Sequence, residues 1–328
     1  MNNSISIIAI NVRKEYKDSI KSKLFLTLVG FLIALIIVSI IVSSFSFKSQ
    51  VADYKSSAQI LKDMGKSSEI PPIPQFFPLK SMRGVIEYIE IIGAIIGIIL
   101  GYLSISREKG KRTLQLVLSR PVKRSDIING KFIGNSFLIL IVLMIGFVFA
   151  FFIIWGVGGL LLNTIEIIKL LLVFLFSYLY IMFFFCLSSI FSLWFKSLSN
   201  ALIICFVIWL VFVLIIPQIG DTMDPDNQIP GGFFKSMNMD KPQEKEVMAK
   251  FITYETTRNA IEVSSITKQY ERLNFAIAGI KDTYNGKDLG LIFKDNWKDL
   301  VLVLSFLLAA YFIEYAILLN KRLIFNGE

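Results

Sequence analysis

Several stretches of 20 or more residues carry no charged side chain, and this feature constrains the fold of the chain more than any other. A helix needs about 20 apolar residues to cross the roughly 30 Å hydrocarbon core of a membrane. Hydrophobic residues make up 55% of the chain and charged residues only 18%, which is more apolar than a soluble domain of this size can bury. The candidate spans are residues 24–47, 85–106, 132–155, 170–195, 198–219 and 300–319. We therefore predict an all-α polytopic membrane protein with six transmembrane helices.

Histidine is absent from the chain, which excludes Ser-His-Asp hydrolysis and zinc sites built from histidine. The two cysteines, Cys186 and Cys205, lie in apolar runs and are expected to be small core residues. A segment at 65–67, Gly-Lys-Ser, is similar to the end of a phosphate-binding loop, but that loop needs a glycine where Ile60 stands. We expect no catalytic, cofactor-binding or metal site, and no ATP hydrolysis by this chain alone.

Basic residues gather in one set of connecting segments. Six spans place both termini on the same side of the membrane, together with the loop 107–131. The segment 1–23 carries five Lys and Arg residues, and the loop carries eight. Because such residues collect on the cytoplasmic side, we expect both termini in the cytoplasm of a multi-pass cell-membrane protein. The net charge of +9 then reflects this topology and contact with the bilayer, and we expect no nucleic acid as a partner.

The N-terminal segment 1–23 predicts a cytoplasmic helix that lies at the membrane surface. Apolar or aromatic residues recur at helical spacing, at Ile5, Ile8, Val12 and Tyr16. The basic residues lie on other faces of the helix. A plain basic topology signal is the alternative. Residues 24–220 are expected to hold transmembrane helices one to five, with an external polar loop at 48–84 and a cytoplasmic loop at 107–131. Residues 300–328 are expected to hold the sixth helix and a cytoplasmic tail.

Residues 221–299 are long enough for an external helical domain before the last span. Asp240 and Gln243 form a helix-capping pattern. Apolar residues then recur at helical spacing, and we expect the domain to pack through Phe251, Tyr254, Ile261, Tyr270 and Leu273. Two interpretations stay open. The domain is either a packed cap over the spans or a gate or docking surface for an external partner.

Three acidic residues lie inside predicted spans, where a charge is costly. Glu87 and Glu90 are three residues apart, share a helix face and lie near the outer end of the second span. They indicate either an acidic patch on a translocation path or interfacial carboxylates in contact with headgroups or with Lys80 and Arg83. Glu314 lies nearer the inner end of the sixth span, and we expect it to have a structural role there.

The loop 107–131 predicts two short helices. Leu114, Val117 and Leu118 form an apolar face on the first helix. Pro121 ends that helix, because the residue before a proline disfavours the α region. Such a helix, held between two spans and flanked by charges, can transmit a push from a soluble partner. Contact with anionic lipids is the alternative.

The order of residues in this loop resembles a known family. It is similar to the first cytoplasmic loop of ABC transporter permeases of the type-2 exporter superfamily, most of all to the branch with the permease of the nitrous-oxide-reductase maturation system. The matching positions are Glu108, Thr113, Leu114, Leu118, Pro121, Val122, Arg124, Ile128, Gly130 and Lys131. The family usually has glycine directly before the threonine, where this chain has Arg112; its own glycine is Gly110.

The resemblance implies a permease subunit, of an exporter, that moves a substrate with ATP hydrolysed by a separate subunit. In the family this loop forms a coupling helix in a groove of the ATP-binding subunit, and two permeases, identical or homologous, assemble with two ATPases. The implied coupling residues are Glu108, Thr113, Leu114, Leu118, Pro121 and Arg124. A membrane sensor or scaffold, whose external domain binds a partner and relays to a cytoplasmic protein, is the other class that the sequence allows.

Overall fold

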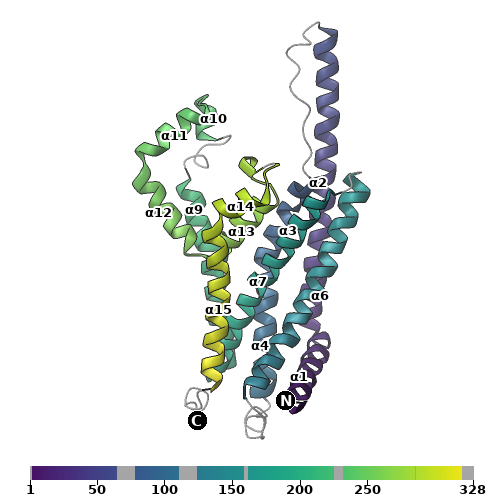
Figure 1. Cartoon of the computed structure of the whole chain (residues 1–328), viewed down its shortest axis with the longest axis vertical. Coiled ribbons are helices and arrows are strands. Elements are labelled where there is room, and N and C mark those ends of the chain that lie inside the picture. The colour runs from purple at the N-terminus through teal and green to yellow at the C-terminus, as the bar shows by residue number, and fades with distance from the viewer. Residues whose placement is uncertain are drawn as a thin grey trace.

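The computed structural model describes residues 2–64, 78–110, 124–158, 162–224, 232–284 and 286–319. Six helical spans in these ranges are long and apolar enough to cross a membrane: Lys23–Asp63, Pro78–Lys109, Ser125–Gly156, Thr164–Trp194, Leu198–Met223 and Trp297–Leu319. No strand occurs in the same ranges, so the predicted all-α fold with six spans is confirmed. The spans run alongside one another, and the N-terminal helix lies at the same end as the close of the last span (Figure 1). We call this the basal end and the opposite end the distal end.

The first span is longer than the sequence pattern predicts. Helix α1 (Asn2–Ile20) ends before Ser22, whose side chain caps the start of α2 (Lys23–Asp63). The 41 residues of α2 extend about 60 Å, twice the hydrocarbon thickness, so its distal part projects beyond the other helices (Figure 1). The prediction of a loop at 48–84 is therefore wrong as far as Asp63, because no glycine or proline interrupts the helix there. The Gly-Lys-Ser segment lies outside the described residues.

The second and fourth spans form the tightest helix pair of the bundle. The second span consists of a 3-10 turn (Pro78–Met82), α3 (Arg83–Tyr88), a π-helical segment (Ile89–Gly93) and α4 (Ala94–Gly110), and it packs on α7 (Thr164–Trp194). Glycines face α7 at the contact. A methyl group on Gly97 would lie 2.5 Å from the Ile181 carbonyl oxygen, and one on Gly101 would clash with the Phe185 carbonyl. The glycines thus let the two backbones touch.

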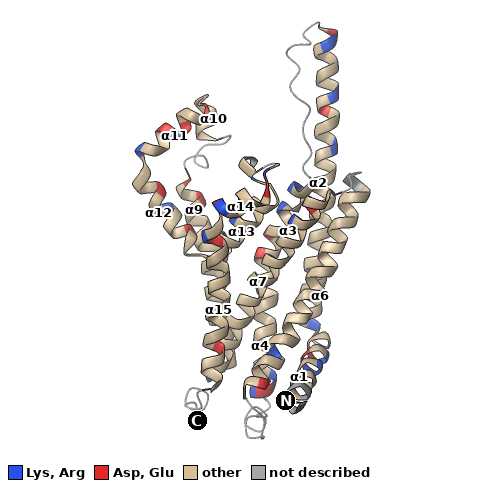
Figure 2. Ribbon diagram, in the orientation of Figure 1, with Lys and Arg blue, Asp and Glu red and all other residues tan. Residues whose placement is uncertain are grey.

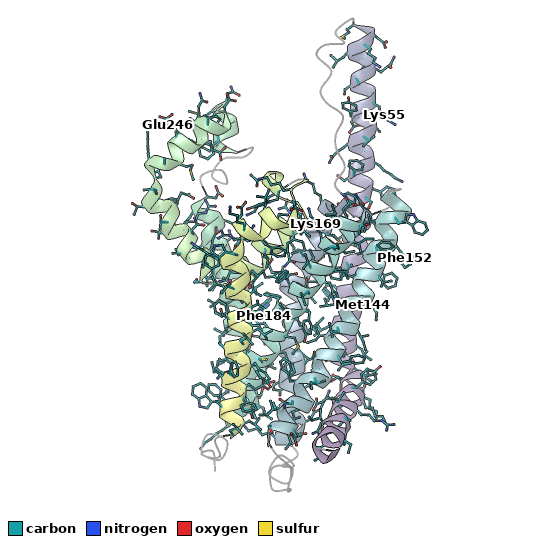
Figure 3. The ribbon with its side chains drawn as sticks, in the orientation of Figure 1. Lys55, Met144, Phe152, Lys169, Phe184 and Glu246 are labelled. Carbon is teal, nitrogen blue, oxygen red and sulfur yellow. The ribbon has the colours of Figure 1, made fainter. Side chains whose placement is uncertain are left out.

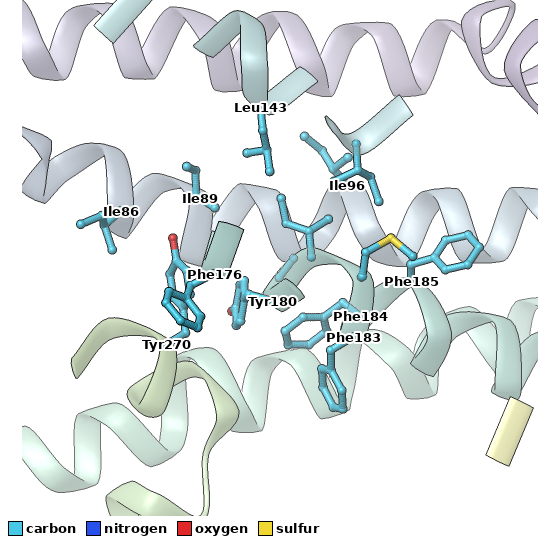
Figure 4. Close-up of a cluster of buried hydrophobic side chains, with 14 of the residues drawn as sticks. Ile86, Ile89, Ile96, Leu143, Phe176, Tyr180, Phe183, Phe184, Phe185 and Tyr270 are labelled. Carbon is cyan, nitrogen blue, oxygen red and sulfur yellow. The ribbon is translucent and has the colours of Figure 1, made fainter. Parts of the chain in front are cut away.

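Helix α7 is the centre of the bundle. It contacts α4, the third span α6 (Arg124–Gly158), α8 (Leu198–Leu210) and the last span α15 (Trp297–Leu319). Its buried aromatic residues fill the space between these helices (Figure 4). Phe184 lies inside, whereas Met144 and Phe152 of α6 point outward, as lipid-facing side chains do (Figure 3). Charged side chains gather toward both ends and on the distal part of α2 (Figure 2).

The fifth span continues from α8 through a π-helical segment (Val211–Ile215) into α9 (Ile216–Met223). The described part of the segment between the fifth and sixth spans is largely helical and lies at the distal end (Figure 1). The following helices are α10 (Phe233–Ser236), α11 (Lys241–Lys250), α12 (Ile252–Val263), α13 (Ile266–Ile277) and α14 (Leu289–Asp295). The Gln243 side chain accepts a hydrogen bond from the Asp240 N–H at 3.0 Å, so the predicted capping pattern at the start of α11 is confirmed.

The helices of this distal segment differ in burial. Helix α13 packs between α7 and α15 and buries ten of its residues, including the predicted Tyr270 and Leu273. The prediction that Phe251 and Tyr254 pack in the domain is wrong, because they are 58% and 43% exposed. Phe251 directly precedes α12 and Tyr254 lies in its first turn; α12 packs on α9, α11 and α13 and buries no residue. Ile261 of α12 is half-buried. Thus α13 caps the spans, and α10–α12 form an arm beside them (Figure 1).

Candidate coupling site

The structure describes the two helices that carry the basic loop, but not its centre. Helix α4 ends at Gly110 and α6 begins at Arg124. The predicted coupling residues Thr113, Leu114, Leu118 and Pro121 lie outside the described residues, as does the Arg124 side chain. Glu108 lies in the last turn of α4. The geometry at the two ends of the loop therefore defines the candidate site.

A buried ion-pair cluster joins both ends of the loop to the N-terminal helix. The Lys131 ammonium on α6 lies 2.8 Å from Glu15 Oε1 on α1 and 3.2 Å from Glu108 Oε1 on α4. These three residues are only 4–5% exposed. Lys14 of α1, which is partly exposed, contacts the same Glu108 oxygen at 2.5 Å. Three helices from distant parts of the chain thus meet at two carboxylates and two ammonium groups.

Small residues bring α1 close enough to α6 for these contacts. A methyl group on Gly130 would lie 2.5 Å from Asn11 Cβ, and one on Gly134 would lie 3.0 Å from Glu15 Cβ. Two glycines four residues apart therefore form the contact face of α6. Because Lys131 follows Gly130 directly, the close approach places its side chain beside Glu15.

Hydrogen bonds to uncharged groups complete the cluster. Lys131 donates to the backbone oxygen of Ser104 at 2.6 Å. Asn135, one turn further along α6, donates to Glu15 Oε2 at 3.3 Å and to the Lys131 carbonyl at 2.9 Å. A buried charge needs such partners, and removing one member of a buried pair costs about 3–5 kcal/mol. The cluster therefore holds α1, α4 and α6 in one fixed arrangement at the ends of the loop.

Glu108, one of the predicted coupling residues, faces the interior, where its carboxylate binds Lys14 of α1 and Lys131 of α6. Sequence reasoning did not identify Glu15. One feature of the sequence did point to it. Glu15 is an acidic residue in a basic helix, and it shares a helix face with Val12 and Ser19. Its partner, however, lies 116 residues away.

Lys109, the next residue of α4, was also missed by the sequence reasoning. Its ammonium group donates to the backbone oxygens of Ser192, Leu193 and Phe195, where α7 ends. Glu108 and Lys109 therefore connect the base of the loop to different sets of helices.

The two acidic residues proposed for a translocation path lie in different environments. Glu87 is exposed and pairs with Arg83 at 2.9 Å, as the interfacial interpretation predicts. Glu90 is buried beside α7, and the Tyr180 hydroxyl donates to its backbone oxygen at 2.8 Å. Tyr180 in turn stacks on Tyr270 of α13, with ring centroids 4.4 Å apart (Figure 4). This contact joins the distal cap to the second and fourth spans.

Glu314 is buried in the last span. Its carboxyl group faces Cys186 and Ser189 of α7. This contact between α15 and α7 agrees with a structural role.

Six apolar spans, a basic loop between the second and third of them and a distal helical cap define a multi-pass membrane protein. The sequence profile of the family described as ABC-2 family transporter protein matches residues 9–323, and the chain belongs to this family. It is the transmembrane component of an ABC transporter rather than the ATPase, and the family implies association with an ABC ATP-binding subunit. Comparison with curated proteins gives no match.

Proposed function

We propose that this chain is the permease subunit of an ABC exporter in the cell membrane, with the basal end in the cytoplasm. A separate ATP-binding subunit docks on the loop 107–131 and supplies the energy, so ATP is bound in the partner and this chain needs no cofactor. The full complex contains a second permease, identical or homologous, and a second ATP-binding subunit. Within the family, the loop sequence favours the branch of the nitrous-oxide-reductase maturation permease.

The buried cluster of Glu15, Glu108 and Lys131 is the observation that carries this proposal. It fixes both ends of the loop to α1, so a displacement of the loop moves three helices together instead of bending a free connection. A loop that served only as a topology signal or as a contact for anionic lipids would need basic residues but no buried carboxylates at its ends. The arrangement therefore supports a loop that receives mechanical work.

The residues of the loop then have separate roles. Leu114 and Leu118 provide the apolar surface that enters the groove of the ATP-binding subunit. Thr113 and Pro121 set the limits of the short helix between them. Glu108, being buried, positions the loop from within the permease, and Arg124 at the start of α6 sets its register against the partner.

Replacement of Leu118 by Asp tests the docking. A buried leucine contributes about 1.5–3 kcal/mol, and an unpaired charge in the contact adds a further cost. We expect the ATP-binding subunit to copurify with the wild-type permease and to be lost, by at least tenfold, with Leu118→Asp. The control is Lys62→Glu, an exposed position on the distal part of α2.

Both variants should insert into the membrane at wild-type levels. Equal recovery of the ATP-binding subunit with Leu118→Asp and Lys62→Glu would remove the docking role of the loop. A failure to recover any ATP-binding subunit with the wild-type protein would instead favour the sensor or scaffold.

A further inference from the structure

The Lys109 side chain makes an unusual contact for a residue at the base of a basic loop. Instead of facing solvent, its ammonium group lies against the end of α7. It donates to the backbone oxygens of Ser192 at 3.2 Å, Leu193 at 3.4 Å and Phe195 at 2.5 Å. Three carbonyl oxygens around one ammonium group match its three N–H donors.

The chemistry of a helix end explains why the contact is favourable. The last carbonyl groups of a helix have no N–H partner within the helix and carry a partial negative charge. Helix α7 ends at Trp194, and α8 begins at Leu198 after a cap by Ser197. The ammonium group of Lys109 therefore satisfies the end of α7 and holds the short turn between α7 and α8 against α4.

Glu108 and Lys109 connect the base of the loop to different sides of the bundle. Successive residues of a helix point about 100° apart. Glu108 thus faces α1 and α6, whereas Lys109 faces the end of α7. Because α7 also contacts α13 and α15, the second connection leads to the distal cap α13 and to the last span.

We propose that Lys109 is a positioning residue that transmits a displacement of the coupling loop to the turn between α7 and α8. This inference rests on the proposed function. The coupling loop would then be connected to the rest of the permease in two ways. The first, through Glu108, moves α1 and α6. The second, through Lys109, moves α7 and α8, and it depends on one side chain bonded to backbone atoms.

Hydrogen exchange of the assembled transporter tests this division. The complex of the permease with its ATP-binding subunit is placed in lipid nanodiscs and compared without nucleotide and with ATP and vanadate. In the wild-type protein we expect nucleotide to change the exchange rates both in residues 111–123 and in the turn 192–200. In Lys109→Met, the loop should respond as before, while the response of the turn falls at least fivefold.

Two further variants separate transmission from simple stability. Lys109→Arg keeps a cationic donor and should restore at least half of the turn's response. Lys196→Met removes an exposed cation from the same turn and should leave both responses unchanged. If Lys109→Met does not insert, Lys109→Gln keeps a neutral donor and should lower the turn's response at least twofold.

The outcomes distinguish this inference from the proposed function. A loop that does not respond to nucleotide in the wild-type complex would contradict the proposed function itself. A loop that responds normally, together with a full response of the turn in the Lys109 variants, would overturn only the role of Lys109.

Discussion

At the scale of single residues, the basal end depends on charges that are buried and paired. Lys131 is tolerated inside the protein because two carboxylates and the Ser104 carbonyl oxygen surround its ammonium group. Arg83 and Glu87 at the distal end also form an ion pair between a basic side chain and a carboxylate, but both side chains are exposed at the protein surface. The two pairs therefore allow a matched comparison between a buried and an exposed ion pair.

Replacement of Glu15 by Gln should destabilise the protein far more than replacement of Glu87 by Gln. Loss of one partner of a buried pair costs about 3–5 kcal/mol, and we expect the lower end because Glu108 stays beside Lys131. An exposed pair contributes only about 0–1 kcal/mol. The measurement is the thermal unfolding of each purified variant in the same detergent. Equal melting temperatures for the two variants would show that the buried cluster contributes little.

Part of this site could be predicted from the sequence. Glu108 and Lys131 both belong to the loop pattern, because that pattern is local in the chain. Glu15 and Lys109 could not be placed, since the first needs the crossing of α1 over α6 and the second needs the position of the end of α7. A spacing rule within one helix does not contain such distances.

At the scale of helices, close packing depends on where glycine occurs. Gly97 and Gly101 of α4 lie against backbone carbonyl groups of α7, so any side chain there would force the helices apart. Gly30 of α2 has no atom within 4 Å of the position that a methyl group would occupy. The same substitution therefore has opposite expected effects at these positions.

Replacement of Gly101 by Ala should destabilise the protein by about 1–3 kcal/mol, the usual cost of overpacking. Replacement of Gly30 by Ala should be neutral or stabilise the protein by up to about 1 kcal/mol, because alanine favours a helix. Melting temperatures of both variants, measured beside the wild-type protein, check this. A Gly101 variant as stable as the Gly30 variant would mean that α4 and α7 are not in backbone contact.

The lengths of the spans show what patterning can and cannot predict. Apolar runs identified all six spans. They did not identify the distal part of α2 as helical, because a polar helix that projects into water lacks the apolar period used to recognise it. Similarly, the spacing of α12 and α13 predicted helices, but only the tertiary arrangement decided that Tyr270 is buried and Tyr254 is exposed.

Helix α13 should also respond to alkaline pH through Lys268. Burial lowers the pKa of Lys268, but Glu271 and Asp221 raise it by more, so it lies above the usual value. Because this pKa is raised on folding, the charge of Lys268 stabilises the folded state fully below about pH 10.4, the pKa of lysine in the unfolded chain. This stabilisation is lost as the pH rises through the pKa of Lys268 in the folded protein.

We expect Lys268→Met to be less stable than the wild-type protein at pH 8 and the difference to shrink above about pH 10.4. The measurement is the melting temperature of the variant and of the wild-type protein, at pH 8 and again above about pH 10.4. A constant difference across this pH range would show that the ammonium charge contributes nothing and that only packing is lost.

At the scale of the whole molecule, the two ends of the bundle are built differently. The basal end holds α1, the end of α4, the start of α6 and the turn between α7 and α8, joined by side-chain contacts between distant parts of the chain. The distal end holds a long projecting helix, a cap and an arm (Figure 1). The proposed mechanism requires the basal end to face ATP, so the orientation of the molecule is a test of it.

Cysteine labelling on intact cells measures this orientation. Cys186 and Cys205 are both buried, so they should react little and leave a low background. A cysteine in place of Lys250, exposed at the end of α11, should react with an impermeant thiol reagent on intact cells. A cysteine in place of Lys21, exposed after α1, should react only after the membrane is permeabilised. A third cysteine, in place of Lys268, should react slowly even though it is distal, because that residue is 8% exposed. Labelling of the Lys21 position on intact cells, with protection of the Lys250 position, would reverse the topology and leave the loop where no cytoplasmic ATP-binding subunit could reach it.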